Sequence, residues 1–261
     1  MKTRLYQLDA FTSRRFSGNP AAVMPLPRFL DDEVLQAIAA ENNLSETAFL
    51  VRDGADYRLR WFTPAVEVPL CGHATLASAA VVLERLEPGR SAVTFHTASG
   101  ALTVRRAGSA FAMDFPARPV APVAASPALA RALGVIPREL LANDVNYLAV
   151  LESERAVRDL SPDIALLARL ERLGVIVTAR GSGSYDMVSR YFTPARGVPE
   201  DPVTGSAHCA LAPYWSARLG KSELEAFQAS RRGGELTCRV RGERVELEGR
   251  CVLYLEGEAQ I

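Results

Sequence analysis

The sequence predicts an α+β protein of two similar halves, each a curved mixed β-sheet around a central buried helix. The first observation is a repeated phrase: RWFTPA at 60–65 returns as RYFTPA at 190–195, half of the 261-residue chain later. The second is a series of short segments that alternate polar and apolar residues, as half-buried strands do. The third is a segment, 74–86, that is apolar on nearly every side and therefore has to be buried.

The first half contains six segments with the period of strands and two with the period of helices. Strands are expected at 4–9, 48–52, 57–62, 91–97, 101–105 and 111–115. A helix is expected at 30–42, capped by Asp31 or Asp32, with one apolar face made of Val34, Leu35, Ile38 and Ala39. The apolar segment 74–86 is expected to form a second helix, around which the sheet curls.

The second half repeats this scheme after a segment rich in proline, 115–128, which we interpret as a linker. Strands are expected at 146–151, 175–179, 187–192 and, as paired strands, over 237–255. Helices are expected at 161–173, capped by Ser161, and at 206–219, where Pro213 predicts a kink or an early break. We therefore predict domains at 1–118 and 119–261, with the last strand free to pack on the first domain.

The composition argues against several classes of partner. Basic and acidic residues balance to a net charge of zero, with a pI of about 6.9, so no long-range field would recruit nucleic acid or an anionic membrane. No apolar run approaches the roughly 20 residues that span a bilayer, and residues 1–6 lack the apolar core of a signal peptide. We expect a soluble, cytoplasmic protein whose four cysteines are free thiols.

Each copy of the repeated phrase runs into a turn of small residues and then a helix. The turn reads CGHAT at 71–75 and TGSAH at 204–208. We expect the two helix N-termini to face each other, where their free N–H groups and partial positive charge would suit a carboxylate or another anion. The cleft between the two halves is therefore the candidate active site.

Four side chains near these turns could carry chemistry. By the offset of the phrase, Asp201 falls where Cys71 falls, so a matched pair of thiol bases is not available. His73 lies at the positive end of its helix, which disfavours its protonation, and it could instead cap that helix. Glu46 precedes a strand, where a carboxylate could transfer protons or remain a solvated charge. Cys71 could be a nucleophile beside His73, with no third group to orient the imidazole, or a small turn residue.

Six segments match a known family. They are DAF at 9–11, FSGNPAAV at 16–23, NNLSETAF at 42–49, RWFTP at 60–64, CGHAT at 71–75 and EDPVTGSA at 200–207. Together they resemble the PhzF-like isomerase family (phenazine biosynthesis protein F and its relatives), which has the diaminopimelate epimerase-like fold. CGHAT with GSAHCALAPYW at 205–215 resembles the widespread branch of that family and not the dedicated phenazine enzymes, so the phenazine substrate does not carry over.

The resemblance implies a homodimeric enzyme that needs no cofactor and no metal, with its active site between the domains. In this family a glutamate shuttles a proton during isomerisation of a small carboxylate-bearing metabolite, and Glu46 matches that glutamate. His73 and Asp201 match residues that grip the substrate and tune the carboxyl group. Ser206 and the N–H groups of Gly72 and Gly205 would anchor the anion.

Two other functions remain open from the sequence. One is an amino-acid racemase or epimerase of the same fold, which needs two opposed bases; Asp201 facing Cys71 would be a poor pair. The other is a metabolite-binding protein that kept the cleft and lost turnover. The residues define neither the physiological substrate nor its pathway.

Overall fold

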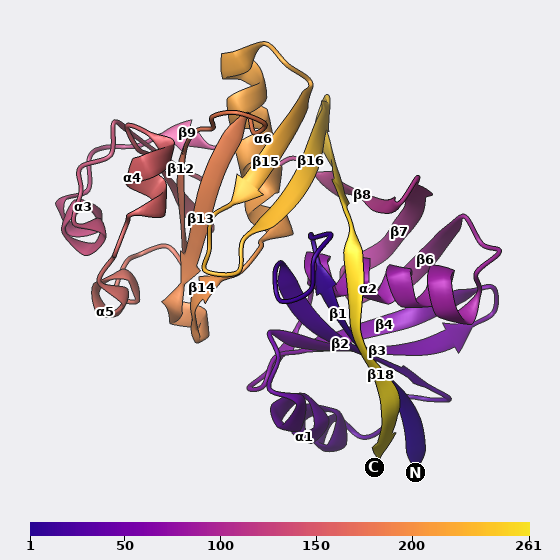
Figure 1. The fold of residues 1–261 in the computed structure, drawn as a ribbon. Helices are drawn as coiled ribbons and strands as arrows, with labels where there is room; N and C mark the ends of the chain where they lie inside the picture. The colour runs from indigo at the N-terminus through magenta and orange to yellow at the C-terminus, as the bar shows by residue number, and fades with distance from the viewer. The chain divides into compact units, whose positions relative to one another are not determined.

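The structure, a computed structural model, describes residues 1–261 as two compact units, in which strands outnumber helices (Figure 1). Unit 1 consists of 1–114 and 248–261, and unit 2 of 115–247. Each unit has buried apolar residues of its own. No helix is long and apolar enough to cross a membrane.

Unit 1 is a mixed sheet with two helices. Across the sheet the strands follow in the order β18 (Cys251–Gln260), β1 (Lys2–Ala10), β2 (Asn19–Leu26), β3 (Glu46–Asp53), β4 (Asp56–Phe62), β6 (Ala92–Thr97), β7 (Gly100–Ala107) and β8 (Ala110–Pro116). The pairs β2–β3 and β4–β6 are parallel, and the other pairs are antiparallel. The two-residue strand β5 (Glu67–Val68) adds to β4. The helix α1 (Asp32–Asn42) connects β2 to β3 and packs on β3.

The helix α2 (Gly72–Val81) is the centre of unit 1. Every residue from His73 to Val81 is buried, and the helix packs against β1, β2 and β3 (Figure 1). Its last turn widens into a π-helical segment, η1 (Val82–Leu86). The prediction of a buried helix within a curled sheet is therefore confirmed, because a helix without a polar face can only be stable inside the sheet.

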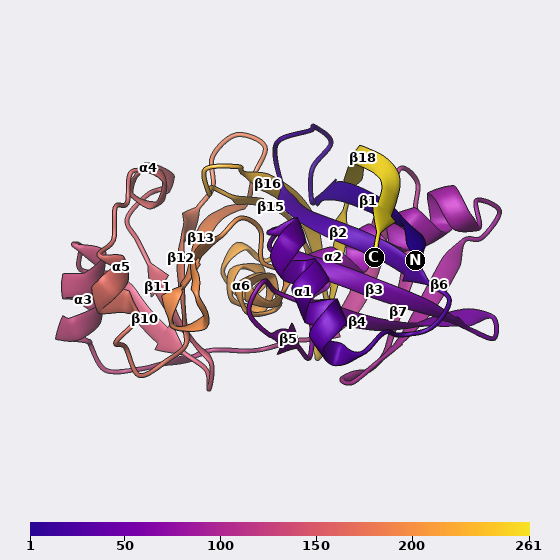
Figure 2. The ribbon, with the colours of Figure 1, turned by 90° about the horizontal axis from the view of Figure 1, so that it is seen from below.

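Unit 2 is also a mixed sheet. Its strands are β9 (Ala121–Pro122), β10 (Glu139–Ala142), β11 (Asn146–Val150), β12 (Gly174–Arg180), β13 (Met187–Thr193), β14 (Val198–Asp201), β15 (Glu223–Gln228), β16 (Gly234–Arg241) and β17 (Arg244–Gly249), whose last residues lead into unit 1. The helices are α3 (Pro127–Leu133), α4 (Glu154–Arg158), α5 (Ile164–Leu167), the 3₁₀ turn η2 (Pro194–Arg196) and α6 (Gly205–Leu219). Figure 2 views α6 nearly along its axis, and the helix packs on β15 and β16.

The two units have the same sequence of strand pairings, so the repeated phrase marks a repeated fold. In unit 1 the pairs β1–β2, β2–β3, β3–β4, β4–β6 and β6–β7 alternate antiparallel and parallel. In unit 2 the pairs β10–β11, β11–β12, β12–β13, β13–β15 and β15–β16 alternate in the same way. Because α2 leads to β6 and α6 leads to β15, the two helices correspond. The predicted α+β class with two pseudo-symmetric halves is confirmed.

Several local predictions were wrong. The helix expected at 161–173 is the single turn α5, capped by Asp163, whose carboxylate accepts from the N–H of Leu166, and not by Ser161. In α1, Asp31 occupies the N-cap position without a side-chain hydrogen bond, and Val34 is exposed. The sequence analysis did not predict β2 or α4, and the expected linker contains β9 and the start of α3. Short elements are fixed by their tertiary partners more than by local propensity.

Pro213 lies inside α6, and the helix continues through it to Leu219. Of the two predicted outcomes, a kink or an early break, the early break is therefore wrong. A proline removes the N–H that would bind the carbonyl four residues earlier, here that of Cys209. In unit 2 this carbonyl accepts a hydrogen bond from the N–H of Arg118 at 2.9 Å. The carbonyl of Cys209 therefore keeps a hydrogen-bond donor, which reduces the free-energy cost of placing a proline in the helix.

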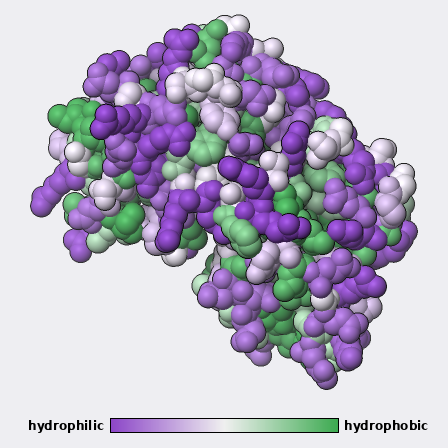
Figure 3. Space-filling model, viewed as in Figure 1, coloured by the Kyte–Doolittle hydropathy of each residue, from purple (hydrophilic) through white to green (hydrophobic).

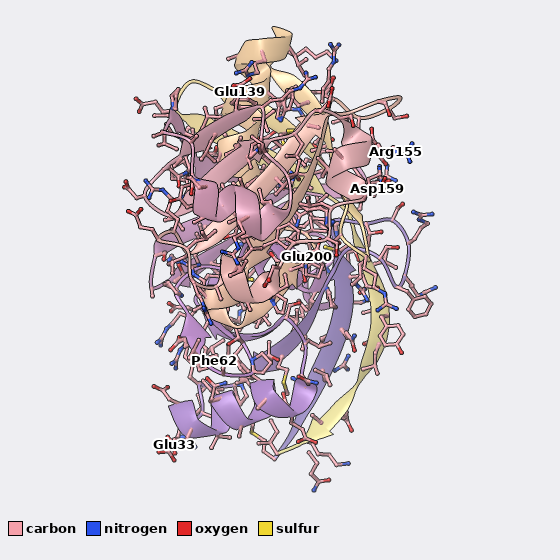
Figure 4. All side chains as sticks on the ribbon, turned by 90° about the vertical axis from the view of Figure 1, so that its left-hand side faces the viewer. Glu33, Phe62, Glu139, Arg155, Asp159 and Glu200 are labelled. Atoms are coloured by element: carbon pink, nitrogen blue, oxygen red, sulfur yellow. The ribbon has the colours of Figure 1, made fainter.

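The repeated phrase also has a physical role, because its arginine forms the same contacts in both units. Arg60 donates twice to Glu67 in unit 1, at 2.7 Å each. Arg190 donates twice to Glu200 on β14 in unit 2, at 2.7 and 2.9 Å, and Glu200 is labelled in Figure 4. Each guanidinium also lies over the aromatic ring two residues later, that of Phe62 or Phe192. Each pair ties a strand to the hairpin that leads into the buried helix.

Outside these contacts, polar residues prevail at the surface. On the face shown in Figure 3, hydrophilic residues cover most of each unit and apolar residues show in small areas between them. Arg155 on α4 and Asp159, the C-cap residue of α4, are both labelled in Figure 4 and form an ion pair at 3.1 Å in which the arginine side chain is 91% exposed. Such a pair contributes little to stability.

We expect Arg190→Ala to lower the free energy of unfolding by about 3 kcal/mol, because it leaves a largely buried Glu200 without its partner. The Arg190 side chain is only 12% exposed. Arg155→Ala is the matched control and should change stability by less than about 0.5 kcal/mol. Urea unfolding followed by circular dichroism measures both, and equal effects of the two substitutions would contradict the role given to the phrase.

Candidate active site

A carboxylate and an imidazole meet in the interior of unit 1. Glu46 is the first residue of β3 and His73 the second of α2, and Oε2 of Glu46 lies 3.0 Å from Nε2 of His73. Both atoms are enclosed, and neither makes a well-aligned hydrogen bond. The Glu46 side chain nevertheless keeps 17% of its surface exposed, so it can be reached from one side. A buried polar pair with unused capacity is a candidate for binding and proton transfer.

The other ring nitrogen of His73 has two neighbours. Nδ1 lies 3.2 Å from the amide nitrogen of Asn19, at the start of β2, and 3.5 Å from Sγ of Cys71, the N-cap residue of α2. All three side chains are buried. The sequence analysis expected no group to orient this imidazole and considered Cys71 a small turn residue. In the structure Glu46, Asn19 and Cys71 orient it together.

The electrostatics of this cluster differ from the helix-dipole expectation. Burial lowers the pKa of His73, but the charges and hydrogen bonds of Cys71 and Glu46 raise it, and the net result lies above the usual 6.5. For Cys71, burial is the main cause that raises the pKa of the thiol, to about 11. Cys71 is therefore a neutral thiol at pH 7, which argues against a thiolate nucleophile.

Glu46, Cys71 and His73 also have the chemistry of metal ligands, and one ligand atom from each lies within 4.8 Å of the others. The imidazole, however, stands between its two partners. It points Nε2 to the carboxylate and Nδ1 to the thiol, whereas a chelated ion needs one nitrogen and both other ligands on the same side. The arrangement fits hydrogen bonding and proton transfer better than metal binding.

Unit 2 lacks the carboxylate of this site. Gly174 begins β12 where Glu46 begins β3, and a side chain there would collide with Asn146 and Tyr191. Asn146, which begins β11, lies opposite Gly174 as Ala21 lies opposite Glu46, so it takes the place of Ala21 and not that of Asn19. A carboxylate at this position therefore occurs in unit 1 alone.

The helix starts correct the assumed equivalence of Asp201 and Cys71. The N-cap of α2 is Cys71 and that of α6 is Thr204, an offset of 133 and not 130 residues. The strand register agrees, because Asp201 lies opposite Tyr191 as Val68 lies opposite Trp61. The difference arises in the hairpin of unit 2, which contains η2. Thr204 therefore corresponds to Cys71, and the exposed Ser206 to His73.

Asp201 is built into a loop that Gln228 holds together within unit 2. The hydroxyl of Thr204 donates to Oδ2 of Asp201 at 2.5 Å. Gln228, on β15 and fully buried, accepts from the N–H of Thr204 at 2.9 Å and donates to the carbonyl of Asp201 at 2.7 Å. No sequence signal pointed to Gln228, because its role depends on a contact with a loop 24 residues away.

The structure thus sorts the sequence-predicted residues between the units. Glu46, His73 and Gly72 lie together in unit 1, and Asp201, Gly205 and Ser206 lie together in unit 2. The N-cap side chains of α2 and α6, Cys71 and Thr204, form no capping hydrogen bond. Asn19 could have been found, because it lies in the segment FSGNPAAV that carries the resemblance.

The comparisons with known proteins agree with this geometry. The family model of the phenazine biosynthesis-like proteins matches residues 8–257. The chain belongs to the phenazine biosynthesis-like family. It is 54% identical to a Pseudomonas aeruginosa protein named as an uncharacterized isomerase, over 98% of both chains. This relative and two others with similar names place the chain in the isomerase class of enzymes.

Solved structures of this family have the same fold. The Enterococcus faecalis protein described as a phenazine biosynthesis protein of the PhzF family covers 100% of both chains with 44% identity and a TM-score of 0.97. A hydroxyproline epimerase from Agrobacterium vitis is 12% identical with a TM-score of 0.62, over 98% of this chain and 92% of its own. The similarity to the hydroxyproline epimerase concerns the fold alone. It shows that the chain has an epimerase-like fold.

His208 predicts a pH dependence of stability. Burial lowers its pKa to about 4, and its Nδ1–H donates to the carbonyl of Thr204 at 2.8 Å. The unfolded histidine, with a pKa near 6.5, takes up a proton first as the pH falls. Stability should therefore drop by about 3 kcal/mol between pH 6.5 and 4, and be unaffected by this group above pH 6.5.

His208→Gln should flatten this part of the stability curve, whereas the exposed His96→Gln should not. Urea unfolding at half-unit pH steps measures the difference between each variant and the wild type. An unchanged slope for His208→Gln would show that the histidine is not neutral in the folded protein.

Gln228→Leu should destabilise the Asp201 loop. We expect a loss of about 3 kcal/mol, because the substitution removes the partners of the Thr204 N–H and the Asp201 carbonyl in a buried place. Gln36→Leu, which removes a single hydrogen bond to the carbonyl of Thr63, is the control and should lose about 1 kcal/mol. A loss for Gln228→Leu no larger than that of the control would contradict the bracing role.

Proposed function

We propose that the protein is a cofactor-independent isomerase that moves a proton on a small carboxylate-bearing metabolite, with Glu46 as the general acid and base. The observation that carries this proposal is the Glu46–His73 pair: a partly accessible carboxylate, 3.0 Å from an imidazole nitrogen, with no well-aligned bond on either atom. A group that both takes and returns a proton needs a carboxyl group that is held in place without being neutralised by a permanent cation.

The proposed reaction has two proton steps. First a C–H bond of the unsaturated acid breaks, its proton passes to Glu46, and the electron pair delocalises into the conjugated system. Then the O–H bond of Glu46 breaks, and the proton forms a new C–H bond at another carbon. The atoms and charges balance without an oxidant, a metal or a cofactor, so the residues of the chain suffice for the chemistry.

We further propose that the remaining residues of the motifs bind the substrate. His73 would hold Glu46, and Asp201 and Ser206 would grip the polar groups of the substrate. The uncapped N–H groups at Gly72 and Gly205 support the binding of a carboxylate, because the first turn of a helix presents free donors and positive potential. The family resemblance also supports a homodimer that acts in the cytoplasm.

A two-base racemase has less support. Cys71 is a neutral thiol at pH 7, and Thr204 takes the corresponding place in unit 2. A pair of thiols exchanging protons across an α-carbon is therefore not available. A metabolite-binding protein without turnover would still keep the Glu46–His73 pair, so the experiment has to separate binding from chemistry.

The test is incubation with a metabolite extract in D₂O, followed by mass spectrometry. We expect the wild type to shift the retention time and add deuterium to at least one carboxylic acid. Glu46→Gln should lower this rate by a factor of at least 10², because the amide cannot carry the proton. Glu41→Gln, an exposed glutamate on α1, is the matched control and should retain the rate.

Each outcome has a distinct meaning. Equal deuterium uptake by the wild type and Glu46→Gln would contradict the proton-shuttle role. A metabolite that binds but is never converted by any form would favour the binding protein. Deuterium at the α-carbon of an amino acid with inversion would favour the epimerase.

A further inference from the structure

The imidazole of His73 is surrounded by groups that decide where its proton lies. Nε2 faces the carboxylate of Glu46 at 3.0 Å, and Nδ1 faces Asn19 and Cys71 at 3.2 and 3.5 Å. These are the titratable and polar partners of the ring, from β3, β2 and the start of α2. Asn19 is 0% exposed and His73 5%, so water does not compete for the ring from the Nδ1 side.

Both neighbours of Nδ1 are hydrogen-bond donors. The amide nitrogen of Asn19 can only donate. The thiol of Cys71 keeps its proton at neutral pH, because burial raises its pKa to about 11, and it too can donate. A nitrogen that faces the obligate donor of Asn19 has to offer its lone pair, so Nδ1 does not carry the proton of the neutral ring.

We propose that Asn19 and Cys71 are positioning residues that keep Nδ1 unprotonated in the neutral ring of His73, so that its Nε2–H faces Glu46 at 3.0 Å. The mobile proton of the reaction then stays on Glu46 and cannot be lost to the far side of the imidazole. This inference rests on the proposed role of Glu46 and extends it to two residues that do not touch the substrate.

The effect of Cys71 on the pKa of His73 is consistent with this assignment. Negative charge on Cys71 would favour a doubly protonated imidazole, but that charge requires a thiolate, which forms only near pH 11. At pH 7 Cys71 is therefore uncharged, and among the causes that raise the pKa of His73 the contribution of the Glu46 carboxylate remains.

The backbone places Asn19 for this role. Gly18 has a φ of 66°, and a side chain there would lie 2.2 Å from the carbonyl oxygen of Ala10. This tight entry into β2 pairs Asn19 with Ala10 and puts it on the strand beside Glu46, since Ala21 lies opposite Glu46 in the parallel register. Gly18 is thus needed to place Asn19.

The chain contains an internal reference for the tautomer. His208 donates from Nδ1 to the carbonyl of Thr204, so it should carry its proton on Nδ1, opposite to His73. With three histidines in the sequence, ring-¹⁵N spectra of the full protein can be assigned with the variants His96→Gln and His73→Gln. No substrate is needed for this measurement.

At a pH where the ring of His73 is neutral, which its raised pKa shifts upward, we expect a protonated Nε2 and an unprotonated Nδ1, and for His208 the reverse. Asn19→Asp supplies an acceptor to Nδ1, so we expect both ring nitrogens of His73 to be protonated and deuterium uptake by the metabolite extract to fall at least tenfold. Asn146→Asp, at a buried asparagine that begins β11 in unit 2, is the control for burying a carboxylate and should leave the spectrum of His73 unchanged.

A second pair of variants protects the test against misfolding of Asn19→Asp. Cys71→Ser keeps a donor and should preserve the Nε2–H tautomer and the pH profile of deuterium uptake. Cys71→Ala removes one of the two donors and should raise the fraction of protonated Nδ1, with a shift of the pH profile that Cys71→Ser rescues. Identical His73 spectra and pH profiles for the two variants would contradict the role of Cys71.

A wild-type spectrum with a protonated Nδ1 in the neutral ring of His73 would overturn the inference. That result together with an inactive Glu46→Gln would contradict this inference alone and leave the proposed function standing. The expected tautomer together with a fully active Glu46→Gln would instead contradict the proposed function. The two failures are therefore distinguishable.

Discussion

The complete burial of α2 from its second residue onward is the constraint from which the candidate site follows. A polar residue in that first turn has no access to bulk water and must find partners inside the protein. His73 finds them on the two strands that pack against the helix, Asn19 from β2 and Glu46 from β3. Since β2 and β3 run parallel in fixed register, both partners reach the ring from one end of the sheet. The site is thus a consequence of how the helix is enclosed.

Unit 2 also has polar residues at the start of a buried helix, and it satisfies their hydrogen bonds with different residues. The side chain one turn into α6, His208, bonds back to the carbonyl of Thr204, as Thr75 in α2 bonds back to the carbonyl of Cys71. The loop before α6 is held by Gln228, while the loop before α2 has no such brace among the contacts of its N-cap residue. The two copies share a backbone pattern and differ in their polar residues. Unit 1 has a carboxylate–imidazole pair, and unit 2 has an exposed serine and an aspartate whose loop is held by Gln228.

The repeat also shows how far a sequence offset can be trusted. The arginine of the repeated phrase has the same position in both units because it forms the same contact in both. In each unit it binds a carboxylate and so connects a strand to the next hairpin. Beyond the phrase the hairpins differ by three residues, and residues assigned by the simple offset no longer correspond. Equivalence is set by strand register and helix N-cap, since these fix where a side chain points.

Local sequence determined the long or strongly patterned elements. The alternating strands and the apolar helix 74–86 follow from periodicity that admits one solution, and the motifs identified Glu46, His73 and Asp201 as candidates. The short helix α5, the passage of α6 through Pro213 and the partners Asn19, Cys71 and Gln228 depend on contacts between segments far apart in the chain. The sequence by itself therefore determined the fold class and, through the family motifs, the candidate residues Glu46 and His73. Only the tertiary structure decided which groups surround that pair, because burial and hydrogen-bond geometry arise when the strands and helices pack.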